Sequence, residues 1–490
     1  MGSNPIPISV AICGGGACAL ALLIRLLEEM RHTESIGRIY IYESLARVGP
    51  GATYSEGSGN AIINQAAESM GLHESDPLHF VRWVESTYPQ FKGDRYPPRH
   101  VYGSYLASLF ASAQLDAASR GLALEIIRGE IVDLRHSTHA FVLQDNHGRS
   151  ISVDKVVLAL GNFPRHSQPH LAAHPGYFGT PWPLYHLDNI PRDSRVCVVG
   201  TRLSGIDAAF HLVDNGHTGP IYLVSRGGRL PTVQGLSSVP DQYKGVLESL
   251  ASRLEERSEP ISLRDLSDQL VRNVDVRDWP DVLHTNDPLR QLSQDMLAAE
   301  KGEISWRSVA DSACPVLERY WNILEMSERV AFIKNWGSLW NTFIHAMPHA
   351  NACRLQNLLR DGRVQAMNFD VIQCQQSGFT ISSSKRRLHA DIVIEATGIE
   401  LDVTRIQTLL LTSLVSSEIL EAHPLGGFSV DQNTLESTTT PGLYVIGSLT
   451  SGVHFYTTGI DRNITHASRI ARHLIGKTVV GRAEAMGGVI

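Results

Sequence analysis

The stretch ISVAICGGGACALALLIRL, residues 8–26, has the pattern of a strand, a glycine turn and a helix. Ile8–Ile12 is a short β-rich apolar run, and apolar residues then recur at helical spacing. Between them, Gly14, Gly16 and Ala19 fit the pattern G-x-G-x-x-A. The first glycine permits the tight turn, the second lets the backbone approach a pyrophosphate, and the third small residue lets helix pack on strand. The stretch therefore predicts a dinucleotide-binding turn.

The next predicted strand, RIYIYES at residues 38–44, ends in Glu43. A carboxylate at the tip of that strand is placed to accept hydrogen bonds from a ribose diol. The N–H groups and the positive end of the first helix would hold the phosphates. This unit therefore suits FAD.

A second unit follows at VVGTRLSGIDAA, residues 198–209. Gly200 takes the turn position and Gly205 the close-packing position, but Arg202 stands where the second glycine is expected. We expect the Arg202 side chain to leave the turn and meet a phosphate as a cation. The alternative is that Arg202 plugs a retired site.

The strand that follows this second turn, within GPIYLVSRGGR at 219–229, ends in Ser225 and Arg226 instead of an acid. A serine and an arginine favour a ribose 2′-phosphate, so the second unit suits NADPH. Arg226 and Arg229 could instead form a solvated basic loop.

Two further segments, DKVVLALGNFP at 154–164 and ADIVIEATGIE at 390–400, are predicted strands that bracket the second unit. They would mark where the chain leaves the first domain and returns to it. We expect an α/β protein with two Rossmann-like dinucleotide-binding domains, the NADPH domain being inserted in the FAD domain. The expected bounds are 1–165 and 399–490 for the FAD domain, and 166–398 for the NADPH domain with a helical insertion at about 235–350.

Composition limits the partners. The 490 residues carry a formal net charge of −7, which argues against a general nucleic-acid or anionic-membrane binder. No apolar run has membrane-spanning length, and the apolar start lacks the basic region of a signal peptide. Six cysteines make no disulfide framework, and Cys13 and Cys18 read as small packing residues rather than a redox pair. We expect a cytoplasmic protein with no metal site; the oligomeric state cannot be inferred from the sequence.

The arrangement resembles the class B flavin monooxygenase superfamily, which includes N-hydroxylating and Baeyer–Villiger enzymes, and more closely a bacterial branch of FAD/NAD(P)-binding proteins. The likeness is carried by residues 61–85, 96–106, 343–359 and 442–475, and is poorest at about 235–330. Ser448, in GLYVIGS, replaces an acid that often ends this strand in the family. The segment YFGTPWPLYHL at 177–187 only echoes the Baeyer–Villiger fingerprint F-x-G-x-x-x-H-x-x-x-W-P.

The resemblance also implies a flavin site near the C-terminal strand, loop and helix, which include Gly447. Thr457 and Thr458 are predicted to cap the helix that follows, with its N-terminus at the flavin pyrimidine edge. Asn64 matches a position that lies along FAD in the family, although it could be an ordinary turn asparagine.

The segment 235–350 is expected to be a solvated helical cover, or else a lid over the cleft between domains. Trp336, Trp340 and His345 could line such a cleft, although packing in the core is the simpler expectation for them.

The predicted function is that of an NADPH-dependent FAD monooxygenase. Its flavin C4a-peroxide would transfer one oxygen atom from dioxygen to a small soluble substrate, by N-hydroxylation or a Baeyer–Villiger-type oxidation. No side chain is named as catalytic. The alternatives are an NAD(P)H-flavin reductase or oxidase without oxygen transfer, and a non-catalytic FAD-binding partner protein.

Overall fold

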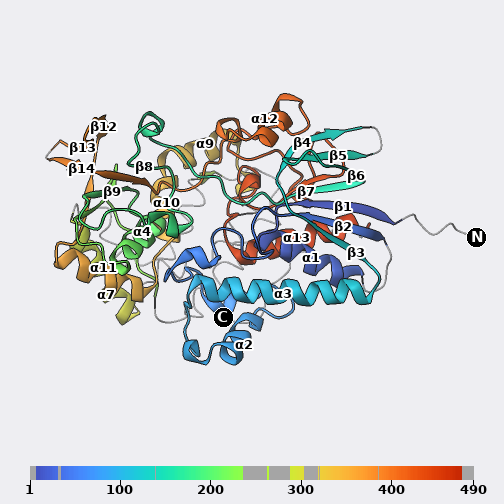
Figure 1. Cartoon of the computed structure of the whole chain (residues 1–490), viewed down its shortest axis with the longest axis horizontal. Helices are drawn as coiled ribbons and strands as arrows, with labels where there is room; N and C mark the ends of the chain where they lie inside the picture. The colour runs from blue at the N-terminus through green and yellow to red at the C-terminus, as the bar shows by residue number, and fades with distance from the viewer. Residues whose placement is uncertain are drawn as a thin grey trace, which may run out of the picture. The chain divides into compact units, whose positions relative to one another are not determined.

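A computed structural model describes residues 7–30, 35–137, 140–235, 262–263, 287–302, 318, 320–384 and 386–476. The chain divides into two compact units, Met1–Phe163 with Glu400–Met486, and Pro164–Ile399 (Figure 1). The chain enters the second unit after Phe163 and returns after Ile399, within the two segments that bracket the second glycine turn. The domain bounds expected from the sequence, and the cofactor of each domain, stay predictions.

The first unit is built on a parallel sheet of five strands in the order β16-β7-β1-β2-β3. Its apolar strands are buried on both faces, as is typical of parallel sheets that helices cover. The strands are β1 (Ile8–Cys13), β2 (Ile36–Tyr42), β3 (Ala123–Ile127), β7 (Lys155–Leu158) and β16 (Leu443–Val445).

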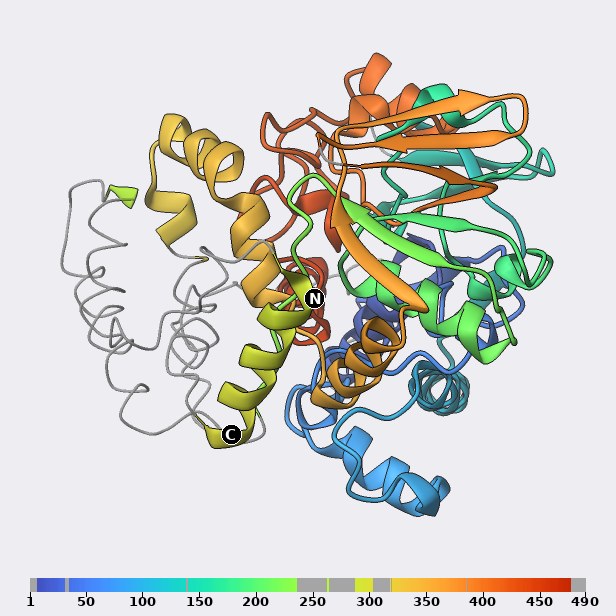
Figure 2. The ribbon, with the colours of Figure 1, turned by 90° about the vertical axis from the view of Figure 1, so that its left-hand side faces the viewer.

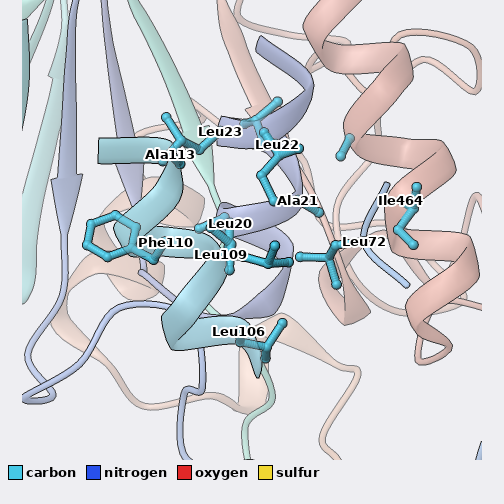
Figure 3. Close-up of a cluster of buried hydrophobic side chains, with 14 of the residues drawn as sticks. Leu20, Ala21, Leu22, Leu23, Leu72, Leu106, Leu109, Phe110, Ala113 and Ile464 are labelled. Carbon is cyan, nitrogen blue, oxygen red and sulfur yellow. The ribbon is translucent and has the colours of Figure 1, made fainter. Parts of the chain in front are cut away.

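Helix α1 (Ala17–Glu29) packs between α3 (Arg99–Ser119) and α13 (Ile460–Leu474). Figure 3 shows Leu22 and Leu23 of α1 in this cluster, with Leu106 on α3 and Ile464 on α13. Nine consecutive residues of α1, Ala19–Leu27, are buried. A helix that is apolar on all sides is held by the elements around it, so α1 is fixed relative to the sheet.

The other face of the sheet carries a second core, covered by an antiparallel sheet β4-β5-β6 and by helix α12, which packs on β4. The unit also contains α2, which packs against α3, and short helical turns that include η10. The bounds of the strands and helices named in this paragraph are β4 (Ile131–His136), β5 (Phe141–Asp145), β6 (Ser150–Val153), α2 (His79–Thr87), α12 (Leu409–Ser416) and η10 (Ser448–Thr450).

The second unit has its own parallel sheet, in the order β11-β10-β9-β15-β8. Figure 2 shows green strands from its first half beside orange strands from its second half. A smaller antiparallel sheet, β12-β13-β14, accompanies it. The bounds are β8 (Tyr177–Phe178), β9 (Val196–Val199), β10 (Ile221–Ser225), β11 (Val364–Asn368), β12 (Val371–Gln375), β13 (Gly378–Ser382), β14 (Arg387–Ala390) and β15 (Ile392–Glu395).

The described α-helices of the second unit are α4 (Leu203–Asp214), α7 (Pro288–Lys301), α9 (Met326–Asn335), α10 (Gly337–Ile344) and α11 (His349–Arg360). The expected α/β class with two Rossmann-like units is confirmed. Within the described ranges, none of the helices combines the length and the apolar character that a membrane crossing needs.

The predicted helical insertion at about 235–350 is described only in part, since residues 236–261, 264–286, 303–317 and 319 lie outside the described residues. The expectation that Trp336 packs in the core is wrong. This residue lies between α9 and α10 and is 56% exposed. Trp340 lies within α10, with its ring centroid 6.1 Å from that of Phe332. His345 follows the end of α10.

Candidate dinucleotide-binding sites

The glycine turn of the first unit is forced by a backbone contact. Gly14 has φ +102°, and a Cβ atom on it would lie 2.2 Å from the carbonyl oxygen of Ala159, just beyond β7. Only glycine tolerates both the left-handed backbone and this approach. The Gly14 N–H donates to the Tyr42 carbonyl at 3.0 Å, which ties the turn to the end of β2.

Gly16 is glycine for a different reason. It is the N-cap of α1 with φ −77° and ψ −167°, a conformation that any residue adopts. A Cβ atom there would meet none of the described atoms within 4 Å, and the first turn of α1 carries no acidic side chain. Neither strain nor the chain itself demands a glycine, so the open space over the helix N-terminus fits a phosphate group. Ala19, fully buried, fills the close-packing position.

Glu43 directly follows β2 and is 7% exposed. Its Oε2 accepts from the Gly15 N–H at 3.1 Å and its Oε1 from the Leu45 N–H at 2.8 Å. Burial raises the pKa of the Glu43 carboxyl, and the two amide donors oppose that rise. A Cβ atom on Gly15 would lie 2.8 Å from the Glu43 Cβ, so Gly15 is required by the acid and not by a ligand.

The second unit repeats the geometry of the first turn. Gly200 has φ +135°, and a Cβ on it would lie 2.2 Å from the carbonyl oxygen of Ala396, just beyond β15. Its N–H donates to the Val224 carbonyl at 2.7 Å, as Gly14 does to Tyr42. A Cβ on Gly205 would lie 2.1 Å from the Gly200 carbonyl oxygen, so this position must also be glycine.

Arg202 is the N-cap of α4, the position that Gly16 has in the first unit. Its φ of −93° and ψ of −173° nearly match those of Gly16. The side chain leaves the turn, and Nη2 donates to the Ser338 carbonyl at 2.7 Å and to Ser338 Oγ at 3.1 Å. Burial and the charge of Arg226 lower the pKa of the Arg202 guanidinium, which shows that two cations stand near each other here.

Ser225 ends β10 at the place that corresponds to Glu43. Its Oγ lies 3.0 Å from Thr201 Oγ1, within hydrogen-bond distance, and Thr201 stands where the first unit has Gly15. The threonine hydroxyl donates its single hydrogen to the Arg229 carbonyl. Arg226 is exposed directly after the strand. Thr201 and Ser225 therefore take the places of Gly15 and Glu43. The positive charge at the end of β10 is that of Arg226.

The segment just after β16 approaches the first turn of α1. A Cβ on Gly447, which has φ +90°, would lie 3.5 Å from Cys18 Sγ. Ser448, where an acid was expected, is 4% exposed and donates to the Gly161 carbonyl at 2.9 Å. The serine therefore joins β16 to the segment after β7. Cys13 and Cys18 are both free, and burial raises the pKa of each thiol to about 12, as expected for packing residues.

The predicted capping of α13 by Thr457 and Thr458 is wrong. The N-cap is Gly459, and neither threonine side chain caps the helix. The cap comes from Gln65 instead: its Oε1 accepts from the Ile460 N–H at 3.1 Å. Sequence reasoning missed Gln65 because it lies some four hundred positions away along the chain, beside the candidate Asn64.

Gln65 also donates through Nε2 to Asp461 Oδ1 at 2.9 Å, so both ends of its amide hold the first turn of α13. Asn64 is half-buried in the same loop. This loop is therefore fixed to the N-terminus of α13, the helix end that the family resemblance assigns to the flavin. Two fully buried histidines, His454 and His466, lie close by with ring centroids 4.3 Å apart.

Comparisons with known proteins agree with this fold. Residues 11–163 match the family model described as FAD-NAD(P)-binding. A search of curated proteins gave no match. Solved structures match along 96% of this chain and 99% of theirs. They include the ornithine hydroxylase of Pseudomonas aeruginosa (13% identity, TM-score 0.59), the ornithine N-hydroxylase of Kutzneria sp. 744 with reduced FAD, NADP+ and L-ornithine (15%, 0.59), and the L-lysine 6-monooxygenase of Pseudomonas syringae (14%, 0.59).

These likenesses establish the fold. The chain is similar in architecture to N-hydroxylating flavin monooxygenases, and the match to the FAD-NAD(P)-binding family model lies within its first unit. The expected resemblance to class B flavin monooxygenases is confirmed at the level of the fold.

The Gln65 cap gives a matched pair of variants. Gln65→Ala removes both hydrogen bonds at the start of α13, and should lower the free energy of unfolding by about 1 kcal/mol, a typical cost for a lost helix cap. Thr458→Ala, at the exposed position before the N-cap, should change it little. Urea unfolding would measure both variants. Equal losses would contradict the assignment of the cap to Gln65.

Proposed function

We propose that this chain is an NADPH-dependent FAD monooxygenase that inserts one oxygen atom of dioxygen into a small soluble substrate. The observation that carries the proposal is the pair of glycine turns. They have the same backbone geometry in the two units, and they differ in the residues that would meet a ribose.

The first unit fits FAD. Gly14 sets the turn, Gly16 leaves space over the N-terminus of α1, and Glu43 stands where its carboxylate would accept hydrogen bonds from a ribose diol. Ala19 lets α1 approach the sheet, and Gly447, just after β16, lies near Cys18 in the first turn of α1. Bound FAD would supply the redox chemistry and the reaction with dioxygen.

The second unit fits NADPH. Gly200 and Gly205 preserve the turn, whereas Arg202 and Arg226 place two positive charges where a 2′-phosphate or a pyrophosphate would bind. Ser225 removes the negative charge that would repel the 2′-phosphate. Burial and the charge of Arg226 lower the pKa of Arg202, and a bound anion would oppose that effect.

The protein would position the flavin and stabilise its charge. The N-terminus of α13 presents the positive end of a helix, which favours the negative charge that a reduced flavin carries on its pyrimidine edge. Gln65 fixes this helix end, and we place Asn64, Thr457 and Thr458 along the same cofactor. No side chain is required as a nucleophile.

N-hydroxylation of a primary amine is the reaction we favour. Solved structures with this fold include hydroxylases of ornithine and lysine, whose side chains end in an amine. A Baeyer–Villiger oxidation has less support. Phe178, Gly179, Trp182 and Pro183 are present in the relevant segment, but the spacing and the histidine order of the fingerprint are not.

The decisive test is the fate of labelled dioxygen. The purified protein, with NADPH and a panel of ornithine, lysine and small diamines under ¹⁸O₂, should form a hydroxylamine with one labelled oxygen atom, detected by mass spectrometry. NADPH oxidation with only hydrogen peroxide formed would favour the reductase or oxidase. A flavin that NADPH fails to reduce would favour the non-catalytic partner protein.

FAD binding can be tested with two alanine variants of the same turn. Gly16→Ala puts a methyl group into the open space, and should weaken FAD binding about tenfold or more. The fold should lose at most about 1 kcal/mol, the cost of alanine at an N-cap. Gly14→Ala should disrupt the fold itself, because its Cβ would meet the Ala159 carbonyl at 2.2 Å. Flavin titration and thermal unfolding separate the two effects; tight FAD binding by Gly16→Ala would contradict the assignment.

The preference for NADPH should depend on Arg226. Loss of a charge-assisted contact to phosphate costs roughly 1.5–3 kcal/mol, so Arg226→Ala should raise the NADPH KM about tenfold or more. NADH use should change little. Arg387→Ala, an exposed arginine on β14, is the matched control. Steady-state flavin reduction gives both constants, and equal losses with both nucleotides would mean that Arg226 is structural.

A further inference from the structure

A thiol, an imidazole and a carboxylate form a chain of contacts on two helices of the second unit. Cys353 Sγ lies 3.5 Å from His349 Nδ1, and His349 Nε2 lies 3.2 Å from Glu300 Oε1. None of these residues belongs to the candidate dinucleotide sites. The order of contacts, thiol to imidazole to carboxylate, is the order in which a base activates a nucleophile and a third group orients the base.

The local structure explains this placement. His349 and Cys353 are four residues apart on α11, so one helical turn brings their side chains to the same face. Glu300 is in the last turn of α7, which packs beside α11 (Figure 1). The two helices are also joined by Gln356, which donates through Nε2 to Ser293 Oγ at 2.9 Å and is 9% exposed.

The carboxylate sets the role of the ring. Glu300 accepts a hydrogen from Nε2, which leaves Nδ1 as the acceptor that faces the thiol. Nδ1 can therefore remove the proton of Cys353 as the sulfur attacks. Glu300 and Cys353 contact opposite nitrogens of the ring, so the three groups do not converge on one point as metal ligands do.

Cys353 differs from the other described cysteines. Cys13, Cys18 and Cys197 are each held in the protonated form by burial, which raises the pKa of their thiols. Cys374 is exposed on β12, and its Sγ contacts only a backbone carbonyl among the described groups. Cys353 is half-buried and has an imidazole beside its sulfur.

We propose that Cys353, His349 and Glu300 form a reactive-thiol site that exchanges with small-molecule disulfides. The Cys353 S–H proton passes to His349 Nδ1, and Sγ attacks one sulfur of the disulfide. The S–S bond of the small molecule breaks as a new S–S bond forms to Cys353, and the leaving thiolate takes the proton from the imidazole. Cys353 is oxidised, the leaving sulfur is reduced, and the product is a mixed disulfide on α11. Glu300 acts as a positioning residue.

The experiment uses the full chain as purified and compares two thiols within it. One protein carries Cys314→Ser and Cys374→Ser and keeps Cys353; the other carries Cys314→Ser and Cys353→Ser and keeps Cys374. Cys314 lies outside the described residues and is removed from both. The probe is 4,4′-dithiodipyridine, a neutral disulfide whose released thiopyridone is followed by absorbance, and the modified peptide is identified by mass spectrometry.

The expected result is that Cys353 reacts at least about tenfold faster than Cys374 at neutral pH, although Cys374 is more exposed. His349→Asn should slow the Cys353 reaction by about tenfold or more, and Glu300→Gln by about threefold. Neither substitution should change the rate at Cys374, whereas a general loss of structure would change both rates.

Two results would overturn the proposal. The first is a Cys353 that reacts no faster than Cys374. The second is an unchanged Cys353 rate in His349→Asn or, if that variant does not fold, in Glu300→Gln. Glu300 has a side chain that is 50% exposed, so its replacement leaves the packing of α7 intact. The test needs neither flavin reduction nor a substrate, so it stands apart from the proposed monooxygenase activity.

Discussion

The close approach of a carbonyl oxygen to a glycine, which occurs once in each unit, is the constraint on which both candidate sites depend. In each unit the residue after a central strand places its carbonyl 2.2 Å from where a Cβ of the turn glycine would lie. The contact pins Gly14 to the end of β7 and Gly200 to the end of β15. Because the turn cannot move relative to these strands, the helix that follows starts at a fixed point above the sheet, with its N–H groups directed outward.

The chain crosses between the units close to these same contacts. Ala159 and Ala396 lie in the segments 154–164 and 390–400, and the crossings follow a few residues later, after Phe163 and Ile399. Each of the two segments therefore contains both a residue that fixes a glycine turn and a boundary between the units.

The sequence was sufficient for the fold and the turns because their determinants are local. Spacing alone located Gly14, Gly16, Gly200 and Gly205, and the strand ends located Glu43 and Ser225. Contacts between distant segments were not accessible in this way. Thr457 and Thr458 have good capping chemistry, yet the structure begins α13 at Gly459 and uses Gln65 for the cap. The chain of Cys353, His349 and Glu300 likewise depends on two helices that only the tertiary structure brings together.

Arg202 is best understood through its neighbours in the turn. The backbone at Arg202 has nearly the conformation of Gly16, so the absence of a glycine has not distorted the turn. The replacement of glycine by Arg202 accompanies two other differences between the turns. Thr201 stands where the first unit has Gly15, Ser225 stands where it has Glu43, and the two hydroxyls bond each other across the strand end.

A plug would be expected to lie over the helix N-terminus, where it would compete with a phosphate. The Arg202 guanidinium instead donates to Ser338, outside the turn, and its pKa is lowered by burial and by Arg226. A half-buried cation near a second cation costs free energy, and a nearby anion would offset that cost. The second turn therefore keeps the shape of the first, and it has arginines at 202 and 226 and a serine in place of the acid.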